Sequence, residues 1–427
     1  MVLSIFQIDF SFFVRWLLGC ARNMAKTTAL LLVLLPVALV FADQAFVGTA
    51  LNGSLLLRPA RGQQVLVDGI AFQSLVETVE TLKTQVGTLT QQLDGYQCMT
   101  VVDTTTITGL NGTSKWNGGV LAPATGRIYG IPHNSASVLI IDPNANTADI
   151  TSITGLTGSA KWHGGVLAGN GKIYCFPWNS ESVLIIDPTT NAADTTSITG
   201  LIGNNKWLGG VLAGNGKIYG IPADSASVLI IDPAINTADT TSITGLTGGG
   251  KWIGGVLAGN GKIYGIPFVS TSVLIIDPTT NTADTTTIND VGGGAGTKWL
   301  DGVLARNGKI YGIPYFSASV LIIDPTTNST DTTAMSGFGS SSTGKLYGGV
   351  LAGNGKIFGI PQDSTFVLIV DPATNTTDTT TIAGLTGTGK WRGGVLAGNG
   401  KVFGIPWHSQ SVLIIQQVCY SVKGFNA

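Results

Sequence analysis

The side chains best suited to chemistry in this chain are its three histidines. His133 follows a recurring proline, His163 follows a recurring tryptophan, and His408 comes two residues after another proline. Imidazole serves as a general base or a metal ligand, but few carboxylates accompany these residues in the sequence. No Ser-His-Asp order, paired acid or cofactor motif is visible. We therefore expect no metal site, no cofactor and no catalytic residue.

Aromatic residues occupy the same two positions in other parts of the chain. The residues after the recurring proline are His133, Trp178, Ala223, Phe268, Tyr315, Gln362 and Trp407. The residues after the recurring tryptophan, which is Leu346 in one copy, are Asn117, His163, Leu208, Ile253, Leu300, Tyr347 and Arg392. Flat rings offer contact area at a low entropic cost, which suits sugars and apolar partner groups. The predicted binding residues are His133, His163, Trp178, Phe268, Tyr315, Tyr347, Arg392, Trp407 and His408.

These positions belong to a unit that the chain repeats seven times. Each unit begins with Lys-Trp, or once with Lys-Leu, at Lys115, Lys161, Lys206, Lys251, Lys298, Lys345 and Lys390. A spacing of 45–47 residues indicates a repeat architecture. Because the units are nearly identical elsewhere, we expect the repeated residues to build the scaffold and the variable ones to lie together on one face.

Each unit predicts four β-strands. W-x-G-G-V-L-A and G-K-I-Y-G-I-P flank an Asn-Gly hairpin signal, and the apolar S-V-L-I-I-D is typical of a strand buried on both faces. An Asp-Pro turn leads to the Thr-rich D-T-T-S-I-T-G, which we expect to form a more polar outer strand. Four antiparallel strands at this period predict an all-β fold, a seven-bladed β-propeller over residues 98–420.

The ends of the repeat array predict how the ring closes. A fourth-type strand starts at Asp103, before the first Lys-Trp, whereas the last unit ends after its third strand at 411–415. The N-terminal strand should therefore complete the last blade. Cys98 and Cys419 fall in the same predicted turn, so we expect a disulfide between them, worth roughly 5–6 kcal/mol in the chain-entropy model. Cys175 replaces a strand glycine and is predicted to be a buried free thiol.

The other repeated polar and aromatic residues have a structural and a functional interpretation. The tryptophans are expected to pack between blades, with ligand contact as the alternative. The lysines are expected to be solvated or paired with acceptors at blade edges, with a ring that attracts an anion as the alternative. The Asp187, Asn191 and Asp194 pattern favours an Asx-stabilised turn over a calcium site.

The unit resembles a kelch repeat in G-K-I-Y-G-I-P followed by S-V-L-I-I-D-P-T-T-N, over about residues 103–416. It departs from kelch repeats at Gly220-Ile221-Pro222, where a double glycine is expected, and in the position of the tryptophan. The resemblance implies a propeller of a kind that mostly binds other proteins and in a minority of cases is an enzyme. The W-x-x-x-V-L-x-x-N-G-K-I-Y-G-I core is also similar to the repeats of tachylectin-type lectins.

The N-terminal part predicts export. Met24-Ala-Lys precedes 14 apolar residues at 29–42, and Val40 and Ala42 fit a signal peptide of residues 1–42 cleaved after Ala42. The alternatives are a true start at Met24 and an uncleaved segment that tethers the protein to a membrane. We expect a secreted or extracellular surface protein, with candidate N-glycan sites at Asn52, Asn111, Asn328 and Asn375.

Residues 43–97 lie outside the repeat and predict a short β segment followed by a helix. A seam with alternating spacings of three and four residues is typical of a coiled coil and consists of Phe72, Leu75, Val79, Leu82, Val86, Leu89 and Leu93. It favours a stalk that forms a homo-oligomer through residues 72–93, the alternative being one helix packed on the neighbouring domain. Residues 421–427 are a C-terminal tail.

The composition narrows the function further. A formal net charge of -1 and 11% charged residues argue against a nucleic-acid-binding surface. We predict an exported binding protein, not an enzyme, that presents an aromatic-rich propeller face to a protein or carbohydrate partner. The alternatives are a structural protein of a surface or matrix and a lyase or hydrolase on a propeller scaffold.

Overall fold

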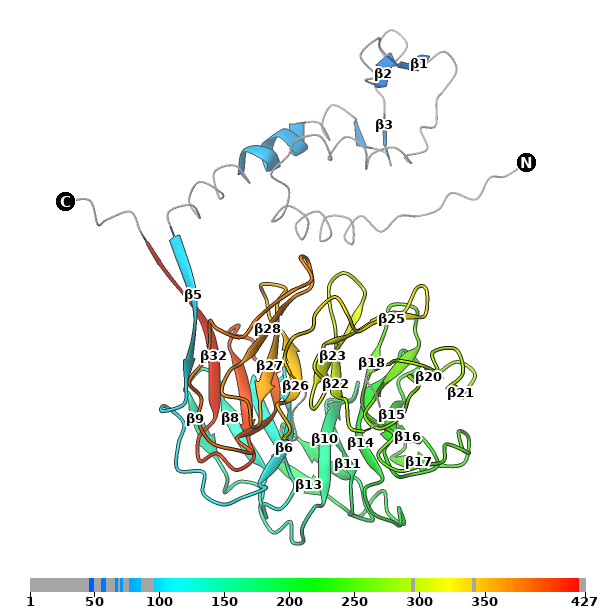
Figure 1. Ribbon diagram of the computed structural model, residues 1–427, viewed down its shortest axis with the longest axis vertical. Coiled ribbons are helices and arrows are strands. Elements are labelled where there is room, and N and C mark those ends of the chain that lie inside the picture. Colours follow the sequence, from blue (N-terminus) through cyan, green and yellow to red (C-terminus); the bar gives the residue numbers. More distant parts are fainter. Residues whose placement is uncertain are drawn as a thin grey trace, which may run out of the picture. The chain divides into compact units, whose positions relative to one another are not determined.

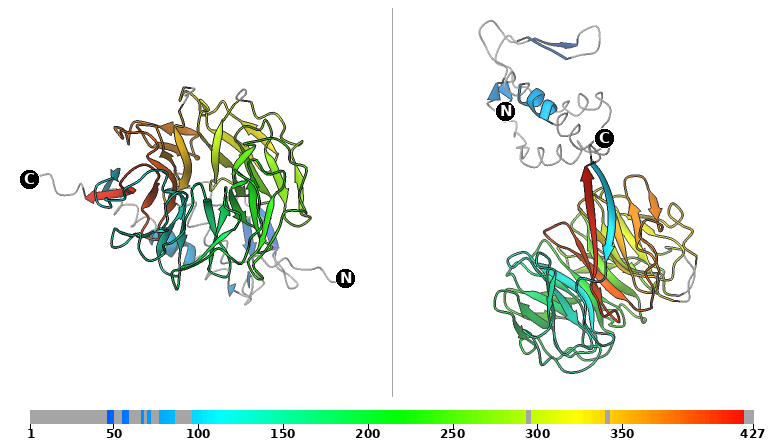
Figure 2. Two further views of the ribbon diagram at one scale, coloured as in Figure 1. Left: turned by 90° about the horizontal axis from the view of Figure 1, so that it is seen from below. Right: turned by 90° about the vertical axis from the view of Figure 1, so that its left-hand side faces the viewer.

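Seven four-stranded antiparallel sheets lie within residues 96–421 and surround one axis (Figure 2, left). The computed structural model describes residues 46–49, 55–58, 66–67, 70–71, 77–85, 96–292, 296–339 and 343–421. The chain divides into two compact units, one of Met1–Cys98 with Cys419–Ala427 and one of Met99–Val418. The predicted seven-bladed all-β propeller is confirmed.

The blades follow the chain order (Figure 1), with the innermost strand first in each. Blades 1 to 3 are β6 (Trp116–Ala122), β7 (Arg127–Pro132), β8 (Leu139–Asp142), β9 (Thr147–Asp149); β10 (Trp162–Leu167), β11 (Ile173–Pro177), β12 (Leu184–Asp187), β13 (Ala192–Asp194); and β14 (Trp207–Leu212), β15 (Ile218–Pro222), β16 (Leu229–Asp232), β17 (Thr237–Asp239). Blades 4 and 5 are β18 (Trp252–Leu257), β19 (Ile263–Pro267), β20 (Leu274–Asp277), β21 (Thr282–Asp284); and β22 (Trp299–Leu304), β23 (Ile310–Pro314), β24 (Leu321–Asp324), β25 (Ser329–Asp331). Blades 6 and 7 are β26 (Leu346–Leu351), β27 (Ile357–Pro361), β28 (Leu368–Asp371), β29 (Thr376–Asp378); and β30 (Trp391–Leu396), β31 (Val402–Pro406), β32 (Leu413–Ser421), β5 (Tyr96–Asp103).

The fourth strand of each blade lies earlier than predicted. In blade 1 it ends at Asp149, where the Thr-rich strand was expected to begin. The Asp149 carboxylate accepts hydrogen bonds from the backbone N–H groups of Thr151 at 2.7 Å and Ser152 at 3.1 Å, which turns the chain out of the sheet. Ile153 then packs into the core with 3% of its surface exposed. The Thr-rich segment is therefore a capped turn and not a strand.

The ring closes as the sequence predicts. The last sheet has the order β30-β31-β32-β5, so the N-terminal strand completes blade 7. Cys98 and Cys419 form a disulfide across this closure, with a sequence separation of 321 residues. The strand β5 ends at Asp103 instead of starting there, which is the same displacement that the other fourth strands show.

The core is divided among the spaces between neighbouring blades. The third strand is buried on both faces, as predicted, with Leu139 0% and Ile140 3% exposed on opposite sides of β8. Trp116 is 2% exposed and its Nε1 donates to the carbonyl of Ser137 at 2.7 Å, so the packing interpretation of the repeated tryptophan is confirmed. Cys175 is a buried free thiol, also as predicted.

Hydrogen bonds between blades hold the edge turns in place. The Tyr129 hydroxyl of blade 1 donates to Asn191 Oδ1 at 2.8 Å and to the Pro188 carbonyl at 3.1 Å in blade 2. Asn191 adopts a left-handed backbone conformation with φ 53°, and Asp187 caps the same turn by accepting from the backbone N–H of Thr189 at 2.9 Å. The predicted Asx-stabilised turn is thus present.

The described residues of the unit that contains the N-terminal residues belong to strands and one helix. Two short hairpins pair β1 (Phe46–Thr49) with β2 (Leu55–Arg58) and β3 (Leu66–Val67) with β4 (Ile70–Ala71). A helix spans 77–85 and exposes Val79 and Leu82 to solvent. The rest of the predicted coiled-coil seam, the signal peptide, Asn52 and the tail 422–427 lie outside the described residues, so the stalk stays a prediction. None of the helical structure described is long and apolar enough to span a bilayer.

Candidate functional site

The W-x-G-G segment of each first strand contains a β-bulge that shapes the central channel. In blade 3, Trp207 pairs with Pro222 and Gly210 pairs with Gly220, so the register shifts between them. The bulged Gly209 has a left-handed φ of 92° and lies so close to the next blade that an added Cβ would be 3.4 Å from Gly254 Cα. Bulges re-aim side chains, and here the residue just before each bulge is directed to the channel mouth.

The variable residues after the tryptophan meet at this mouth. Leu208, Ile253, Leu300 and Tyr347 form one buried cluster with Ala223, although they come from different blades. Three aromatic residues from the post-proline positions pack against this cluster: Trp178, Phe268 and Tyr315. The two sets of variable positions therefore lie together on one face, opposite the Asn-Gly hairpins.

A hollow of about 260 Å³ opens over this cluster. Trp178, Phe268 and Tyr315 form its walls, and Leu208, Ile253 and Leu300 form its floor. Tyr347, Arg392, Asn205 and Asp224 also line it. Five of the nine predicted binding residues line this pocket, which we call the axial pocket: Trp178, Phe268, Tyr315, Tyr347 and Arg392.

The ring of residues around the channel mouth is divided into an apolar and a polar part. Blades 3, 4 and 5 contribute the apolar part through Leu208, Ile253 and Leu300. Blades 6, 7, 1 and 2 contribute the polar part through Tyr347, Arg392, Asn117 and His163. A ligand in the axial pocket would therefore meet apolar surface on one side and hydrogen-bonding groups on the other.

The polar part contains a buried hydrogen-bond network. The Tyr347 hydroxyl accepts from Asn117 Nδ2 at 3.4 Å and lies against His163 Nε2 at hydrogen-bonding distance. The same hydroxyl can donate to His163 Nε2 or accept from it, according to the imidazole tautomer. Among the described residues, neither His163 Nδ1 nor Asn117 Oδ1 has a hydrogen-bond partner. The polar part of the channel mouth thus contains one buried imidazole nitrogen and one buried amide oxygen without partners in the described part of the chain.

The two histidines near the channel are neutral at physiological pH. Burial, with smaller contributions from the positive charges of Arg392 and Lys161, lowers the pKa of His133 to about 4. Burial also holds the pKa of His163 well below its ordinary value. The ring of His133 lies 5.2 Å from Trp178 and 4.8 Å from Trp407, so this imidazole is packed as an aromatic group.

Arg392 is fixed between aromatic rings. Its guanidinium carbon lies 3.8 Å from the ring centroid of Trp407 and 4.6 Å from that of Tyr347. Its Nε donates to Gln362 Oε1 at 2.9 Å. Trp407 itself is 6% exposed and acts as the platform for this guanidinium instead of lining the axial pocket.

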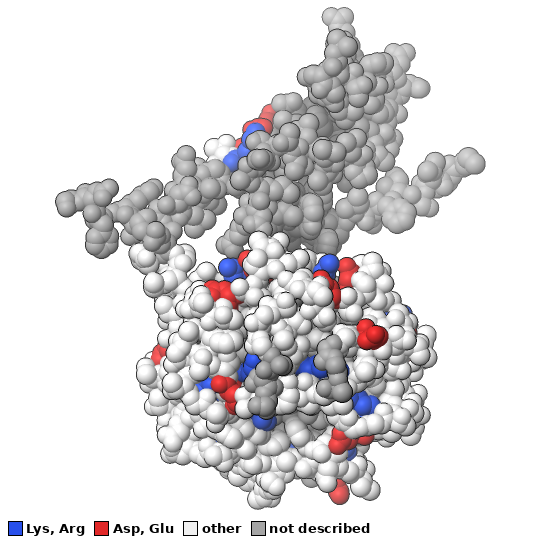
Figure 3. All heavy atoms as spheres, viewed as in Figure 1, with Lys and Arg blue, Asp and Glu red and all other residues white. Residues whose placement is uncertain are grey.

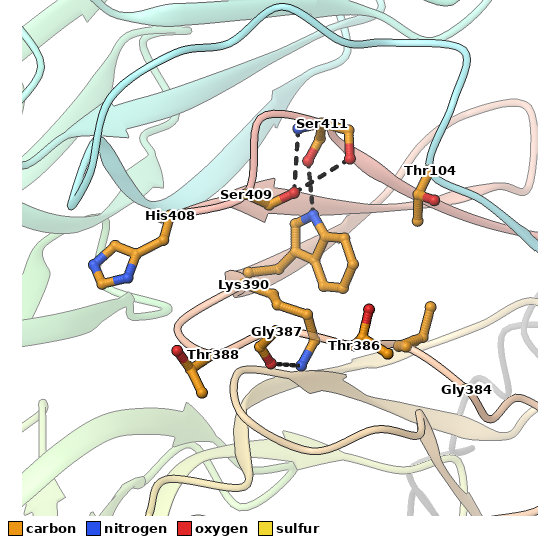
Figure 4. Close-up of a pocket in the computed structure, with 11 residues that line it drawn as sticks. Thr104, Gly384, Thr386, Gly387, Thr388, Lys390, His408, Ser409 and Ser411 are labelled. Atoms are coloured by element: carbon orange, nitrogen blue, oxygen red, sulfur yellow. Dashed lines mark hydrogen bonds between the residues drawn. The ribbon is translucent and has the colours of Figure 1, made fainter.

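His408 does not join the other two histidines. It is exposed and lines a second pocket of about 390 Å³ formed by the loop 384–388 and the loops of blade 7 (Figure 4). Its Nε2 lies 3.3 Å from the hydroxyl of Ser114, and its ring stacks on Trp407. The structure thus separates His408 from the channel, although it belongs to the same face.

The repeated lysines are structural. Lys115 is 3% exposed, and its Nζ donates to the carbonyls of Gly112, Trp407 and Ser409 at 2.9–3.0 Å. In Figure 4 Lys390 makes the equivalent bond to Gly387. The expectation that the lysines are solvated is wrong, whereas pairing with acceptors at the blade edge is correct. Because these ammonium groups are buried, they do not form a free cationic ring at the surface, which carries few charges (Figure 3).

Asp301 is a candidate residue that the sequence reasoning missed. It replaces the bulge glycine in W-L-D-G-V-L, has a left-handed φ of 66°, and accepts from the backbone N–H of Gly302 at 2.8 Å. Its carboxylate lies in the channel, where an added Cβ on Gly254 would be 2.5 Å from its Oδ1. Burial raises the pKa of Asp301 to about 6. The departure from W-x-G-G was the signal that could have identified it.

No group of three or more His, Cys, Asp or Glu residues in the described part of the chain could hold a metal ion. The polar groups around the channel mouth are two imidazoles, an amide, a phenol, the guanidinium of Arg392 and the carboxylate of Asp301. This set is suited to hydrogen bonding.

A protein-family model described as a repeat of unknown function (DUF6923) matches residues 81–302, just over half of the chain. The chain belongs to this repeat family. The match begins before the first blade and ends in the first strand of blade 5, so in this DUF6923 protein it spans blades 1 to 4 completely. No curated protein matches the chain.

Solved structures that resemble this DUF6923 protein are propellers of different origin. A virginiamycin B lyase from Staphylococcus aureus has a TM-score of 0.59 and 9% identity, covering 76% of this chain and 99% of its own. A Kuenenia stuttgartiensis hydrazine synthase chain has a TM-score of 0.53 and 13% identity, covering 73% and 97%. The extracellular domain of a protein described as a one-component system from B. thetaiotaomicron has a TM-score of 0.53 and 11% identity, covering 71% and 41%. At these identities the likeness shows the fold alone.

Proposed function

We propose that this chain is an exported binding protein that holds its ligand in the axial pocket. The observation that carries the proposal is the convergence of the variable residues. The blades are nearly identical in their packing positions, yet the residues after the tryptophan and after the proline differ and meet at one hollow of about 260 Å³. The propeller architecture alone does not choose between binding and catalysis.

The chemistry of the pocket limits the partner. A floor of Leu208, Ile253 and Leu300 has no hydrogen-bonding side-chain atom, so the group that rests on it must be apolar. The aromatic walls of Trp178 and Phe268 suit an apolar side chain of a protein partner or the apolar face of a sugar. Both predicted partner classes, protein and carbohydrate, could supply such a group.

A purely structural role gives no reason for the polar part of the channel mouth. Leaving His163 Nδ1 and Asn117 Oδ1 buried without partners costs about 1–3 kcal/mol each. A protein that needed only rigidity would gain stability from apolar residues at these positions.

Binding is also favoured over catalysis. A general base works best when its pKa lies near the operating pH, but burial lowers the pKa of His133 to about 4 and that of His163 well below its ordinary value. The Nε2 of His163 is in addition engaged by Tyr347. These imidazoles would therefore be weak bases, and we propose that the site binds without turnover.

Export is supported by the disulfide between Cys98 and Cys419, since disulfides persist mainly in oxidising compartments. Among the predicted glycan sites, Asn111, Asn328 and Asn375 are exposed. The Oδ1 atoms of Asn328 and Asn375 accept from Tyr264 and Tyr311, and a glycan linked through Nδ2 would leave these acceptors in place. We propose a secreted glycoprotein if the source glycosylates such sites.

Oligomerisation through residues 72–93 would multiply the site. Several copies of one weak site raise the avidity for a repetitive partner without any new contact. The native mass of the secreted protein tests this part of the proposal, since a monomer would exclude avidity as its mode of action.

A pocket-filling substitution tests the proposed function. Ala223→Phe places in blade 3 the residue that blade 4 carries at the equivalent Phe268, so the scaffold should accept it while the axial pocket is filled. The matched control is Ile235→Phe, at an exposed position in the turn after β16. Ligands found by screening glycan, peptide and small-molecule collections should bind the control but not Ala223→Phe. Equal binding by both variants would place the site elsewhere.

A further inference from the structure

Arg392 is a partly buried cation without a carboxylate partner. Among the described side chains no carboxylate lies within ion-pairing distance of its guanidinium, and only Nε makes a hydrogen bond, to Gln362. The two stacked rings of Trp407 and Tyr347 hold the group in one orientation. Removing a cation from water without a partner costs free energy. The guanidinium of Arg392 is held in place, and within the described part of the chain its two Nη atoms make no hydrogen bond.

Arg392 lines the axial pocket, whose surface is mostly apolar apart from Asn205 and Asp224. Its guanidinium lies next to Tyr347, and Leu208, Ile253 and Leu300 line the same hollow. A ligand that fills this space therefore combines an apolar body with one group that accepts hydrogen bonds from a guanidinium. The planar fork of Arg matches the two oxygens of a carboxylate.

The other charged groups near the pocket do not offer a cation that could bind an anionic ligand. Lys206 and Lys251 direct their Nζ atoms to backbone carbonyls. Asp224 lies on the rim in blade 3, is exposed, and already accepts from the backbone N–H of Gly250. Asp301 lies in the channel and is hydrogen-bonded to Gly302. Arg392 is thus the cation that remains available to a ligand.

We propose that the axial pocket binds a small organic acid, with its apolar body on Leu208, Ile253 and Leu300 and its carboxylate on the Nη atoms of Arg392. This inference rests on the proposed function and names the ligand class for the same site. A cavity of about 150 Å³ holds benzene, so a hollow of about 260 Å³ has room for an aromatic ring with a short chain that carries the carboxylate. The occupant proposed is therefore a small free acid.

Calorimetric titration of the full chain with a matched pair of probes tests this. 3-Phenylpropionate carries the body and the carboxylate, and 3-phenylpropanamide carries the same body without the charge. The acid should bind saturably and the amide at least roughly tenfold more weakly, because charge-assisted bidentate hydrogen bonds are lost. Acetate, which has the charge without the body, should show no saturable binding.

Two substitutions at Arg392 distinguish the contribution of its positive charge from that of its planar guanidinium. Arg392→Gln should reduce the affinity for the acid to that for the amide. Arg392→Lys keeps the positive charge but loses the planar fork, so an intermediate loss is expected. The melting temperature of each variant shows whether it is folded, and the affinity of the amide is an internal control because its binding should not change.

The outcomes distinguish this inference from the proposed function. Equal affinity of acid and amide, or no binding of either, would overturn the organic-acid proposal. The proposed function would survive if another ligand bound the native chain but not Ala223→Phe. If a peptide with a C-terminal phenylalanine bound as a free acid while 3-phenylpropionate did not, the occupant would be a protein C-terminus and the proposal would be wrong. Acid binding that persists in Ala223→Phe would overturn both.

Discussion

The hydroxyl of Tyr347 in blade 6 contacts Nε2 of His163 in blade 2, across the mouth of the central channel. The two residues are 184 positions apart in the chain and belong to blades that are not neighbours. Their contact ties opposite sides of the ring together. The polar part of the channel mouth is therefore one network and not a set of independent side chains.

Removing this contact should destabilise the ring measurably. Tyr347→Phe keeps the ring that packs against Arg392 but leaves His163 Nε2 and Asn117 Nδ2 without their buried partner. We expect the free energy of unfolding to fall by about 1–3 kcal/mol, measured by urea denaturation. The matched control is Tyr315→Phe, whose hydroxyl has only a 3.4 Å contact with Gln362. Similar losses in both variants would contradict the network.

Asp301 should make stability depend on pH. Burial raises its folded-state pKa from 3.8 to about 6, so the folded protein disfavours the charged form. The unfolding free energy should then fall as the pH rises from about 4 to about 6 and stay lower above that range. The difference is at most about 3 kcal/mol, and less where water reaches the carboxylate.

Asp301→Asn provides the control for this pH dependence, because it keeps the shape and tolerates the left-handed backbone. At pH 7 the Asn variant should be more stable than the native protein, and below pH 4 the difference should disappear. Asp301→Gly should raise the free energy of unfolding further, and equally at every pH, because glycine adopts the left-handed φ without strain. The difference in unfolding free energy between the native protein and Asp301→Asn is compared at pH 4 and pH 7. If this difference is the same at both pH values, the carboxylate is not desolvated.

The scaffold could be predicted from the sequence because its signals are local and repeated seven times. Asn-Gly turns, the apolar third strand and the offset between the first and last units specify the blades, the closing strand and the Cys98–Cys419 pair. The fourth strand was misplaced because threonine favours strands, whereas Asp149 and its equivalents cap turns that end the sheet.

The site could be predicted only in part. The variable positions were visible, but which of them meet depends on the narrow channel produced by the bulge glycines. The positions of the blades around the ring determine which residues meet. They bring Tyr347 to His163, stack Arg392 on Trp407 and keep His408 apart from the other histidines. Neither spacing nor residue type reports these relationships.

The bulge glycines should tolerate almost no side chain. Gly393 has a φ of 74°, and a Cβ there would lie 2.9 Å from the Cα of Gly118 across the closure of the ring. Gly393→Ala should therefore be strongly destabilising, by more than about 2 kcal/mol, through a backbone clash and an unfavourable φ. The control is Gly398→Ala in the hairpin after the same strand, where a Cβ has open space. Thermal unfolding of the two variants should differ clearly, and equal melting temperatures would contradict the proposed tightness of the channel.

The disulfide at the closure should contribute stability through the unfolded state. Cys98 and Cys419 are separated by 321 residues, so their bond restricts a very long loop. Replacing both by serine should lower the free energy of unfolding by about 2–5 kcal/mol, measured by chemical denaturation of the full chain. A reductant should lower the melting temperature of the native protein but not of the double variant, because Cys175 is a buried free thiol. If the reductant affects both equally, the stabilisation does not come from this bond.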